Sequence, residues 1–301
     1  MINSKAILVF IFLLTSGTVF TQDSPDTKYW ILFQDKGVFK PDADMSVGSI
    51  AYNAAKEIIS ERALARRMKV LPKDKLLSYK DLPVSKEYVS KLEDLGVKII
   101  AQSRWLNGVS AYMTKRIEEK TKSLEFVETT GIVQKLQIQE IKIENIEDPE
   151  GTTDYGKSLK QMEVVNVPKI HELGITGKGV LIASFDDGFD WRNHEALRDL
   201  NVIGEYDFVN EDDRTHYEKN QVYEDERKQG AHGTAVISTM SGYKEGKLIG
   251  PAYGSDLLLA KTEYVTSETP MEEDFWLEAA EWAEALGVDI ITSSLIYKEY
   301  D

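Results

Sequence analysis

The sequence contains no cysteine and little histidine or proline. Its 301 residues include 4 His and 8 Pro. The absence of cysteine excludes disulfides, thiol nucleophiles, Cys-ligated zinc and iron–sulfur clusters. An apolar content of 42% with 10% aromatic residues excludes a disordered or collagen-like chain. At about 100–200 residues per domain, the length predicts a globular protein of about two domains.

Positive charge and long hydrophobic runs are also scarce. Lys and Arg number 36 against 51 Asp and Glu, for a net charge of −15, so nucleic acid and anionic lipid are not expected partners. The apolar run at the amino end covers only Ala6–Leu14, short of the ~20 residues that span a bilayer. Lys5 precedes this run and small polar residues follow it. We therefore predict a signal peptide over residues 1–21 rather than a membrane anchor, and a secreted, extracellular or periplasmic product with no membrane attachment after signal cleavage.

Residues 22–147 show mixed helix and strand patterns, which predict a small α+β domain. A polar, turn-rich segment over residues 148–157 is the predicted linker to a second domain. The elements expected in the first domain are a strand at 29–33, a helix from about 49 to 68, a helix at 85–95 stopped by Gly96, strands at 97–101 and 108–113, a helical turn at 115–122 and an alternating strand through Leu136, Ile138, Ile141 and Ile143.

A basic cluster lies on the first predicted helix. It comprises Arg62, Arg66, Arg67 and Lys69, close to Glu57 and Glu61. Mixed charges on a helix are typical of a solvated face. We interpret the cluster in this way and predict no function for it.

Residues 158–301 alternate strand and helix patterns. Buried strands are predicted at 180–185, 257–260 and 288–292, with a helix from Thr234 to about Met240. A second helix is predicted between Thr269 and Gly287, with Thr269 as its cap, Pro270 in the first position and Glu272 completing a capping box. This order predicts a right-handed parallel α/β sheet. Ligand sites of such sheets lie at the carboxyl ends of the strands, where Asp186 and Ser293-Ser294 fall.

Asp186 and His232 are the candidate chemical residues. A carboxylate at a buried strand end and a His at a helix start can meet across the sheet edge. A buried Asp that accepts a hydrogen bond from an imidazole fixes its tautomer and stabilises the imidazolium formed during proton transfer. The alternative, which the spacing leaves open, is that Asp186 or Asp187 caps a turn and that His232 only fills space.

Four motifs of the second half resemble those of subtilisin-like serine proteases, the subtilases. The motifs are Val180–His194 with Asp186-Asp187-Gly188, Gly230-Ala-His-Gly-Thr-Ala-Val236, Ile249-Gly-Pro-Ala252 and Asp289-Ile-Ile-Thr-Ser-Ser-Leu295. Three motifs of the first half, Ser60-Glu-Arg-Ala63, Asp81-Leu-Pro-Val84 and Trp105-Leu-Asn-Gly-Val109, resemble the propeptide of secreted bacterial subtilases. The resemblance implies a subtilisin-like catalytic domain at 158–301 behind a propeptide domain at 22–147.

The resemblance also implies roles for individual residues. Asp186 is the expected triad Asp and His232 the expected general base. Ser294 and Leu295 are the expected substrate-binding residues, which would pair with an extended peptide. Asp187 stands where the family usually has Ser or Thr, and a second carboxylate there could raise the pKa of His232 or bind a cation. Ile296 replaces the family's Gly after Ser-Leu, which makes the edge of the pocket strand uncertain.

The third triad residue is not found in the sequence. Subtilases carry Asp, His and Ser in that order along the chain, and no Ser after His232 lies in a Gly-Thr-Ser-Met-Ala-like turn. We therefore expect an amino-terminal part of a longer serine endopeptidase precursor that acts on polypeptides, inactive as the 301-residue chain. A non-catalytic, propeptide-like inhibitor or pseudo-enzyme is the alternative.

Metal chemistry gives a further alternative. Ser184-Phe-Asp-Asp-Gly188 also resembles the motif of metal-dependent polysaccharide deacetylases, but position 236, one helical turn after His232, is Val instead of the second His that such a site needs. No cofactor is expected for catalysis. Because Glu205–Gln229 is rich in carboxylates without regular spacing, structural calcium is possible there and a solvated loop is favoured. His194 and His216 are expected at the surface.

Overall fold

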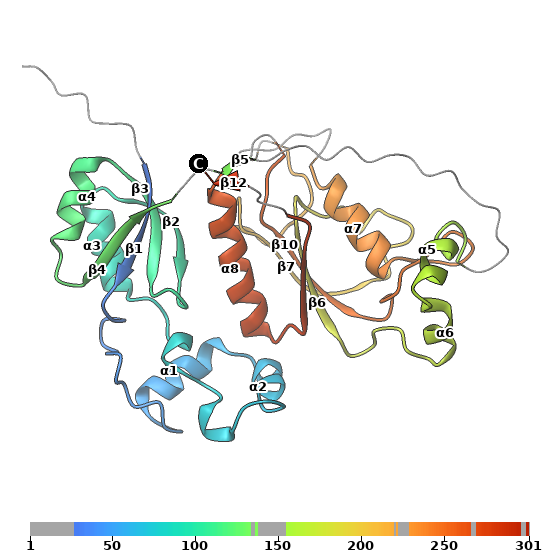
Figure 1. The fold of residues 1–301 in the computed structure, drawn as a ribbon, viewed down its shortest axis with the longest axis horizontal. Helices are drawn as coiled ribbons and strands as arrows, with labels where there is room; N and C mark the ends of the chain where they lie inside the picture. Colours follow the sequence, from blue (N-terminus) through green and yellow to red (C-terminus); the bar gives the residue numbers. More distant parts are fainter. Residues whose placement is uncertain are drawn as a thin grey trace, which may run out of the picture.

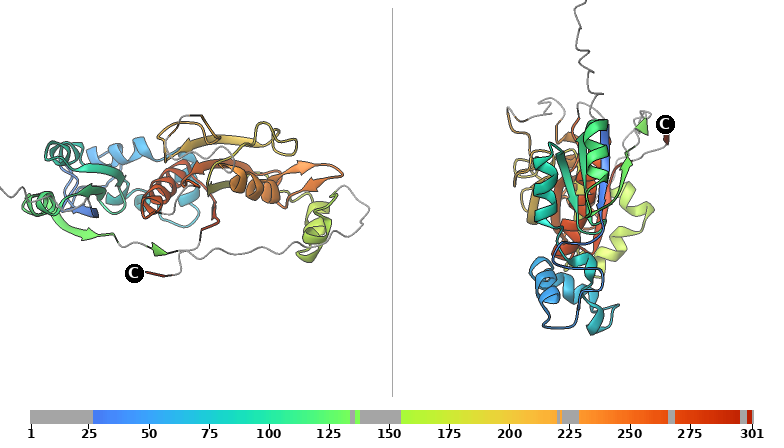
Figure 2. Two further views of the ribbon diagram at one scale, coloured as in Figure 1. Left: turned by 90° about the horizontal axis from the view of Figure 1, so that it is seen from above. Right: turned by 90° about the vertical axis from the view of Figure 1, so that its left-hand side faces the viewer.

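The computed structural model describes residues 27–133, 136–137, 155–219, 221, 229–265, 269–295 and 299–300. Their sheets form two domains, and helix α8 (Met271–Leu286) lies between these sheets (Figure 1, Figure 2). The predicted signal peptide, most of the predicted linker, and Ile138, Ile141 and Ile143 lie outside the described residues.

The first domain is an antiparallel sheet with two helices on one face. Its strand order is β2-β3-β1-β4. On β1, Tyr29, Ile31 and Phe33 alternate into the core, as the period of two predicted. The elements are β1 (Thr27–Phe33), β2 (Lys98–Ser103), β3 (Gly108–Met113), β4 (Val127–Ile132), α3 (Lys86–Asp94) and α4 (Lys115–Lys122). The expected α+β fold is confirmed, although β4 was not predicted.

The single helix predicted over residues 49–68 is wrong. The chain forms α1 (Ile50–Ile58) and α2 (Glu61–Arg67), separated by the extended residue Ile59. The Ser60 hydroxyl accepts the Ala63 N–H at 3.0 Å and so begins a new helix. The apolar pattern continues across the break because both helices pack in one cluster, which is why periodicity alone did not show it. Two short 3₁₀ turns, η1 (Lys73–Lys75) and η2 (Tyr79–Asp81), follow.

The second domain has the predicted parallel sheet at its centre. The strand order is β11-β6-β10-β7, and all pairs are parallel. Every residue of β6 is buried, with α8 on one face of the sheet and α7 on the other (Figure 1). The bounds are β6 (Leu181–Asp186), β7 (Asn201–Asp207), α7 (Ala231–Ser241), β10 (Asp256–Lys261) and β11 (Ile290–Ser293). The strand β7 was not predicted.

Two details of this domain differ from the prediction. The strand β11 lies at the edge of the described sheet, and Ile290 and Ile291 are 52% and 36% exposed instead of buried. The helix α8 begins at Met271, and its predicted capping box forms only by half. Glu272 accepts the Thr269 N–H, but the Thr269 hydroxyl bonds the Tyr264 hydroxyl and does not cap the helix.

Short elements complete the described chain. They are α5 (Leu159–Val164), α6 (Val167–Glu172), the hairpin of β8 (Tyr243–Lys244) and β9 (Leu248–Ile249), and the pair of β5 (Leu136–Gln137) with β12 (Glu299–Tyr300). This last pair joins the chain that follows the first domain to the chain that follows β11. Within the described residues, no helix has the length and apolar character that a membrane crossing requires.

Candidate active site

The structure brings Asp186 and His232 together. Asp186 is the last residue of β6 and His232 the second of α7, and their Oδ1 and Nδ1 atoms lie 2.7 Å apart. The Asp186 side chain is 1% exposed and that of His232 is 58% exposed. Since a carboxylate only accepts, the imidazole donates its Nδ1–H, which leaves Nε2 to take a proton from an incoming group.

Two glycines allow this approach. A Cβ on Gly233 would lie 2.3 Å from the Gly188 carbonyl oxygen and 2.9 Å from the Asp186 Cβ. Gly188 has a φ of +127°, and a Cβ added to it would lie 2.6 Å from the Thr215 carbonyl oxygen. The glycines of Asp-Asp-Gly and His-Gly are therefore required by the close contact of the two motifs.

Thr234 joins the same two motifs by hydrogen bonds. Its hydroxyl accepts the Asp190 N–H at 2.8 Å and donates to the Gly230 carbonyl at 2.5 Å. These bonds hold the start of α7 on the loop that follows Asp186. Apart from the motif that contains Thr234, no pattern in the sequence indicates this positioning role.

Asp187 is a second buried carboxylate beside the pair. Its N–H donates to Asp186 Oδ1 at 2.9 Å, and its Oδ1 accepts the Gly233 N–H at 2.9 Å. Burial, with repulsion from the Asp186 charge, raises the pKa of Asp187 to about 6. The Asp186 Oδ2 atom is buried and has no hydrogen-bond partner among the described residues.

Ser294 and Leu295 follow the edge strand β11. Because β11 pairs in parallel with β6, with Ser293 opposite Phe185, their carboxyl ends lie at the same sheet edge as Asp186. Ser294 is exposed and Leu295 is half-buried. Their substrate-binding role stays a prediction, and Ile296 lies outside the described residues.

The other histidines and the carboxylate-rich segment lie outside the Asp186–His232 pair. His171 bonds Tyr155 and Pro251, and His194 is exposed. In the carboxylate-rich segment, Glu205 accepts from the Thr215 hydroxyl at 2.8 Å, and Asp207 forms a fully buried ion pair with Lys261 at 2.8 Å. The structural calcium expected there stays a prediction.

The prediction of a solvated basic cluster on residues 62–69 is wrong for Arg66 and Arg67, which are partly buried, and Arg62 is exposed as expected but also bonds the second domain. Arg62 donates to Asp289 at 2.6 Å and to the Gly179 and Gly287 carbonyls, so it crosses to the second domain. Arg66 and Arg67 both bond Glu284 on α8. Lys69 is exposed as expected. The sequence could not reveal this, because the acceptors lie more than 100 residues away along the chain.

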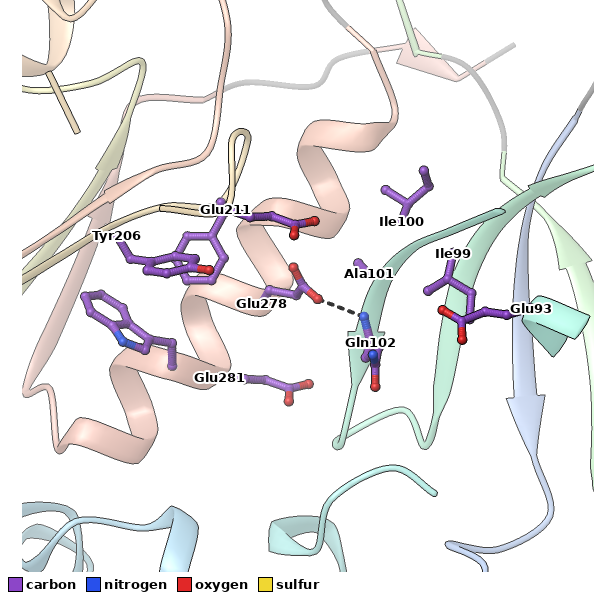
Figure 3. Close-up of a pocket in the computed structure, with 11 residues that line it drawn as sticks. Glu93, Ile99, Ile100, Ala101, Gln102, Tyr206, Glu211, Glu278 and Glu281 are labelled. Carbon is purple, nitrogen blue, oxygen red and sulfur yellow. Dashed lines mark hydrogen bonds between the residues drawn. The ribbon is translucent and has the colours of Figure 1, made fainter. Parts of the chain in front are cut away.

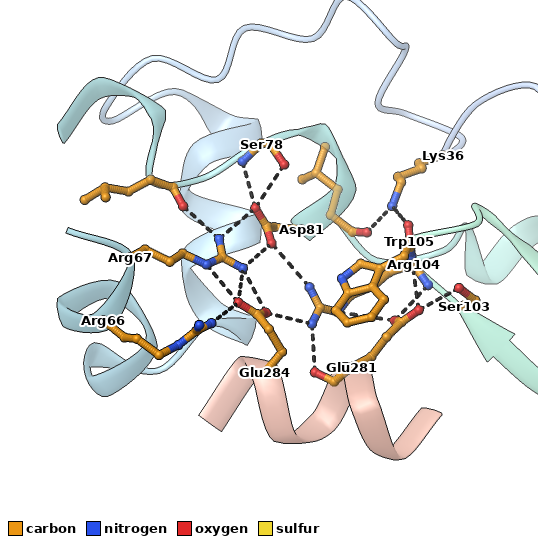
Figure 4. Close-up of polar contacts among 12 residues, drawn as sticks. Lys36, Arg66, Arg67, Ser78, Asp81, Ser103, Arg104, Trp105, Glu281 and Glu284 are labelled. Atoms are coloured by element: carbon orange, nitrogen blue, oxygen red, sulfur yellow. Dashed lines mark hydrogen bonds and ion pairs between the residues drawn. The ribbon is translucent and has the colours of Figure 1, made fainter. Parts of the chain in front are cut away.

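Arg66 and Arg67 belong to a larger polar network between the domains (Figure 4). Arg67 bonds Asp81 in a bidentate manner at 2.8 and 3.0 Å, and Arg104 bonds the same carboxylate at 3.3 Å. Arg104 also donates to the Glu281 carbonyl at 2.8 Å. The side chains of Arg104, Asp81 and Glu281 are each under 10% exposed. Buried pairs of this kind require all partners to be present.

One face of α8 presents carboxylates to the first domain. Asp274, Glu278 and Glu281 recur at helical spacing, and we call them the acidic ridge. Asp274 pairs with Lys28 at 2.6 Å, and Glu278 accepts the Gln102 N–H at 2.8 Å. Glu281 accepts from the Ser103 hydroxyl at 2.6 Å and from two N–H groups at 3.0 and 3.2 Å, those of Arg104 and Trp105. Glu278 and Glu281 thus receive the donors at the end of β2, and Asp274 receives a donor from β1.

A cavity of about 660 Å³ lies beside the ridge (Figure 3). Strand β2 supplies Ile99–Gln102 on one side, and Tyr206, Phe208 and Trp282 line the other. Four carboxylates also line it, from Glu93, Glu211, Glu278 and Glu281. Burial, with repulsion from neighbouring carboxylates, raises the pKa of Glu278 to about 7.

Comparison with known proteins identifies both domains. Residues 28–150 match the family model described as the peptidase S8 propeptide domain of Bacteroidota, and residues 177–298 match that of the subtilase family. The chain therefore has a domain of the peptidase S8 propeptide type in front of a domain that matches the subtilase family. The expected fold class is confirmed.

The comparisons also find individual proteins that resemble parts of this chain. Neuroendocrine convertase 2 of Bos taurus is 33% identical over 93 residues, which cover 30% of this chain and 14% of that protein. Fervidolysin of Fervidobacterium pennivorans, a keratinolytic enzyme related to subtilisin, superposes with a TM-score of 0.51 at 15% identity, over 90% of this chain and 36% of that one. The epidermin leader peptide processing serine protease of Staphylococcus aureus gives a TM-score of 0.49 at 12% identity, over 90% of this chain and 50% of that one. The chain spans half or less of the length of these relatives.

Proposed function

We propose that this chain is part of the precursor of a secreted serine endopeptidase that hydrolyses polypeptides through an Asp-His-Ser triad. The bond between Asp186 and the exposed imidazole of His232, in a domain that matches the subtilase family, is the observation that supports it most. In this proposal the nucleophilic serine lies beyond residue 301 of the whole protein, and residues 1–21 direct export.

Each residue then has a defined step. His232 Nε2 removes the proton of the serine hydroxyl as the oxygen attacks the scissile carbonyl, and later returns it to the leaving amine. Asp186 keeps Nδ1 protonated and stabilises the imidazolium. Ser294 and Leu295 hold the substrate as an added strand at the sheet edge.

The propeptide domain is the proposed partner of the catalytic domain before activation. The arginine network and the acidic ridge hold it on α8, and the β5–β12 pair holds the chain that follows it. Self-cleavage is proposed near residues 147–157.

The test is to express the full-length protein and treat it with a fluorophosphonate probe, which labels activated serines. We expect labelling of the wild type and a large loss, together with loss of self-cleavage, in His232→Ala. His194→Ala, an exposed His outside the site, is the control and should label normally. Normal processing and labelling of His232→Ala would refute the assignment.

A further inference from the structure

The second carboxylate of the Asp-Asp-Gly motif has no part in the proton transfer described above. Asp187 is 7% exposed and lies beside Asp186, which is fully buried. Two adjacent buried carboxylates repel each other, and a cation offsets that cost.

The side chains of Asp186, Asp187 and His232 form a compact ligand set. Each can offer one oxygen or nitrogen atom, and these atoms all lie within 4.8 Å of one another. Asp186 Oδ2 is buried without a partner among the described residues. Carboxylate oxygens and an imidazole nitrogen are ligand types that Zn²⁺ accepts, and the open side toward solvent at His232 leaves room for a water as fourth ligand.

The outer contacts of these ligands are already formed. Asp186 Oδ1 accepts the Asp187 N–H, and Asp187 Oδ1 accepts the Gly233 N–H. Such backbone bonds orient ligating carboxylates. Ligand atoms on a tetrahedral Zn²⁺ at ~2.1 Å lie about 3.4 Å apart, so the Asp186–His232 pair, at 2.7 Å, opens slightly and the wider separations in the set, which are at most 4.8 Å, close on the ion. His232 is exposed enough to make this movement.

We propose that Asp186, Asp187 and His232 bind a Zn²⁺ ion that holds the catalytic pair in an inactive form. The regulatory consequence rests on the proposed function, whereas the metal site does not. The ion binds Nδ1 of His232 in place of its proton, which goes to solvent, and the ring keeps the proton on Nε2. Nε2–H has no lone pair to accept a serine proton, so the base is blocked.

The experiment is a Zn²⁺ titration of the 301-residue chain in competition with a chromophoric chelator. We expect one ion per chain, bound at least about tenfold more weakly in Asp187→Ser, because even outer-shell changes cost 10–100-fold. Asp190→Ser, an exposed Asp in the same loop, is the matched control and should leave the affinity unchanged within about twofold.

A second measurement does not depend on any variant. In the wild type, ¹⁵N NMR of His232 should show Zn²⁺ shifting Nδ1 and leaving the proton on Nε2. No Zn²⁺ binding, equal affinity in Asp187→Ser, or an unchanged His232 spectrum would overturn the proposal. If the full-length protein reacts with the fluorophosphonate probe but binds no Zn²⁺, only the proposed metal site is refuted. If it binds Zn²⁺ but does not react with the probe, only the proposed protease function is refuted.

Discussion

Glu278 makes the stability of the two-domain chain depend on pH. Its carboxylate lies in the interface cavity among Asp274, Glu211 and Glu281, and the donor that faces it is the Gln102 N–H. Burial is the largest cause of its raised pKa. Replacing Glu278 with Gln keeps an acceptor for the Gln102 N–H and removes the charge.

The magnitude follows from the shift in pKa. The value is about 7 in the folded chain against an ordinary 4.5. Because the folded state holds the proton more tightly, the favourable contribution is complete below pH 4.5 and is lost as pH rises through 7. At about 1.4 kcal/mol per pKa unit, the free energy of unfolding should fall by roughly 2–3 kcal/mol across this range.

The assay is urea unfolding at a series of pH values from 4.5 to 8.5. We expect Glu278→Gln to gain about 2–3 kcal/mol over the wild type at pH 8 and to equal it near pH 4.5. Taking the difference between the two proteins removes the contributions of all other titrating groups. Glu93→Gln, an exposed residue at the rim of the same cavity, should show no such difference.

A parallel pH profile for wild type and Glu278→Gln would refute the reasoning. It would mean that the carboxylate stays ionised at the interface, held by the Gln102 N–H, and that the repulsion from its neighbours is offset. A gain in Glu93→Gln equal to that in Glu278→Gln would assign the effect to net charge instead of burial.

Three further predictions concern the domain interface and the Asp186–His232 pair. Glu281→Ala should lower the free energy of unfolding in urea by about 3–5 kcal/mol, because buried donors lose their acceptor. The control Glu245→Ala, on an exposed turn, should change it by less than about 0.5 kcal/mol in the same titration. Gly233→Ala should cost about 1–3 kcal/mol and separate His232 from its carboxylate, and a retained downfield Nδ1–H resonance in proton NMR would contradict this. Arg62→Ala should cost at most about 1 kcal/mol, since its side chain is 39% exposed; a larger drop in melting temperature than for Glu281→Ala would show that the ranking by burial is wrong.

Much of the fold could be predicted because local patterns and packing agree. The apolar run that became β6 is buried on both faces of a parallel sheet, and Gly287 ends α8 in the left-handed conformation with φ +90°. The strand β7 was missed because its residues are only partly buried and Glu205 interrupts the apolar pattern. The residue types and positions of Asp186 and His232 predicted that their side chains could lie together, and in the structure they share a hydrogen bond.

The domain interface could not be predicted. Arg104 and Glu281 are polar residues on a strand end and a helix, and polar residues usually face solvent. Their burial depends on each meeting partners from a domain about 180 positions away, and no local pattern carries that information. The arginines of α2 were assigned to solvent for the same reason.

The acidic ridge limits how freely the two halves of this protein can be exchanged. One side of α8 builds the core of the second domain through Phe275, Ala279 and Ala283, and another receives the donors of the propeptide domain. A substitution on this helix can therefore disturb the core of one domain, the contact with the other, or both. A propeptide transplanted from another subtilase should dock only when its donors fit these carboxylates, so chimeras will succeed when α8 and the propeptide are moved as one unit.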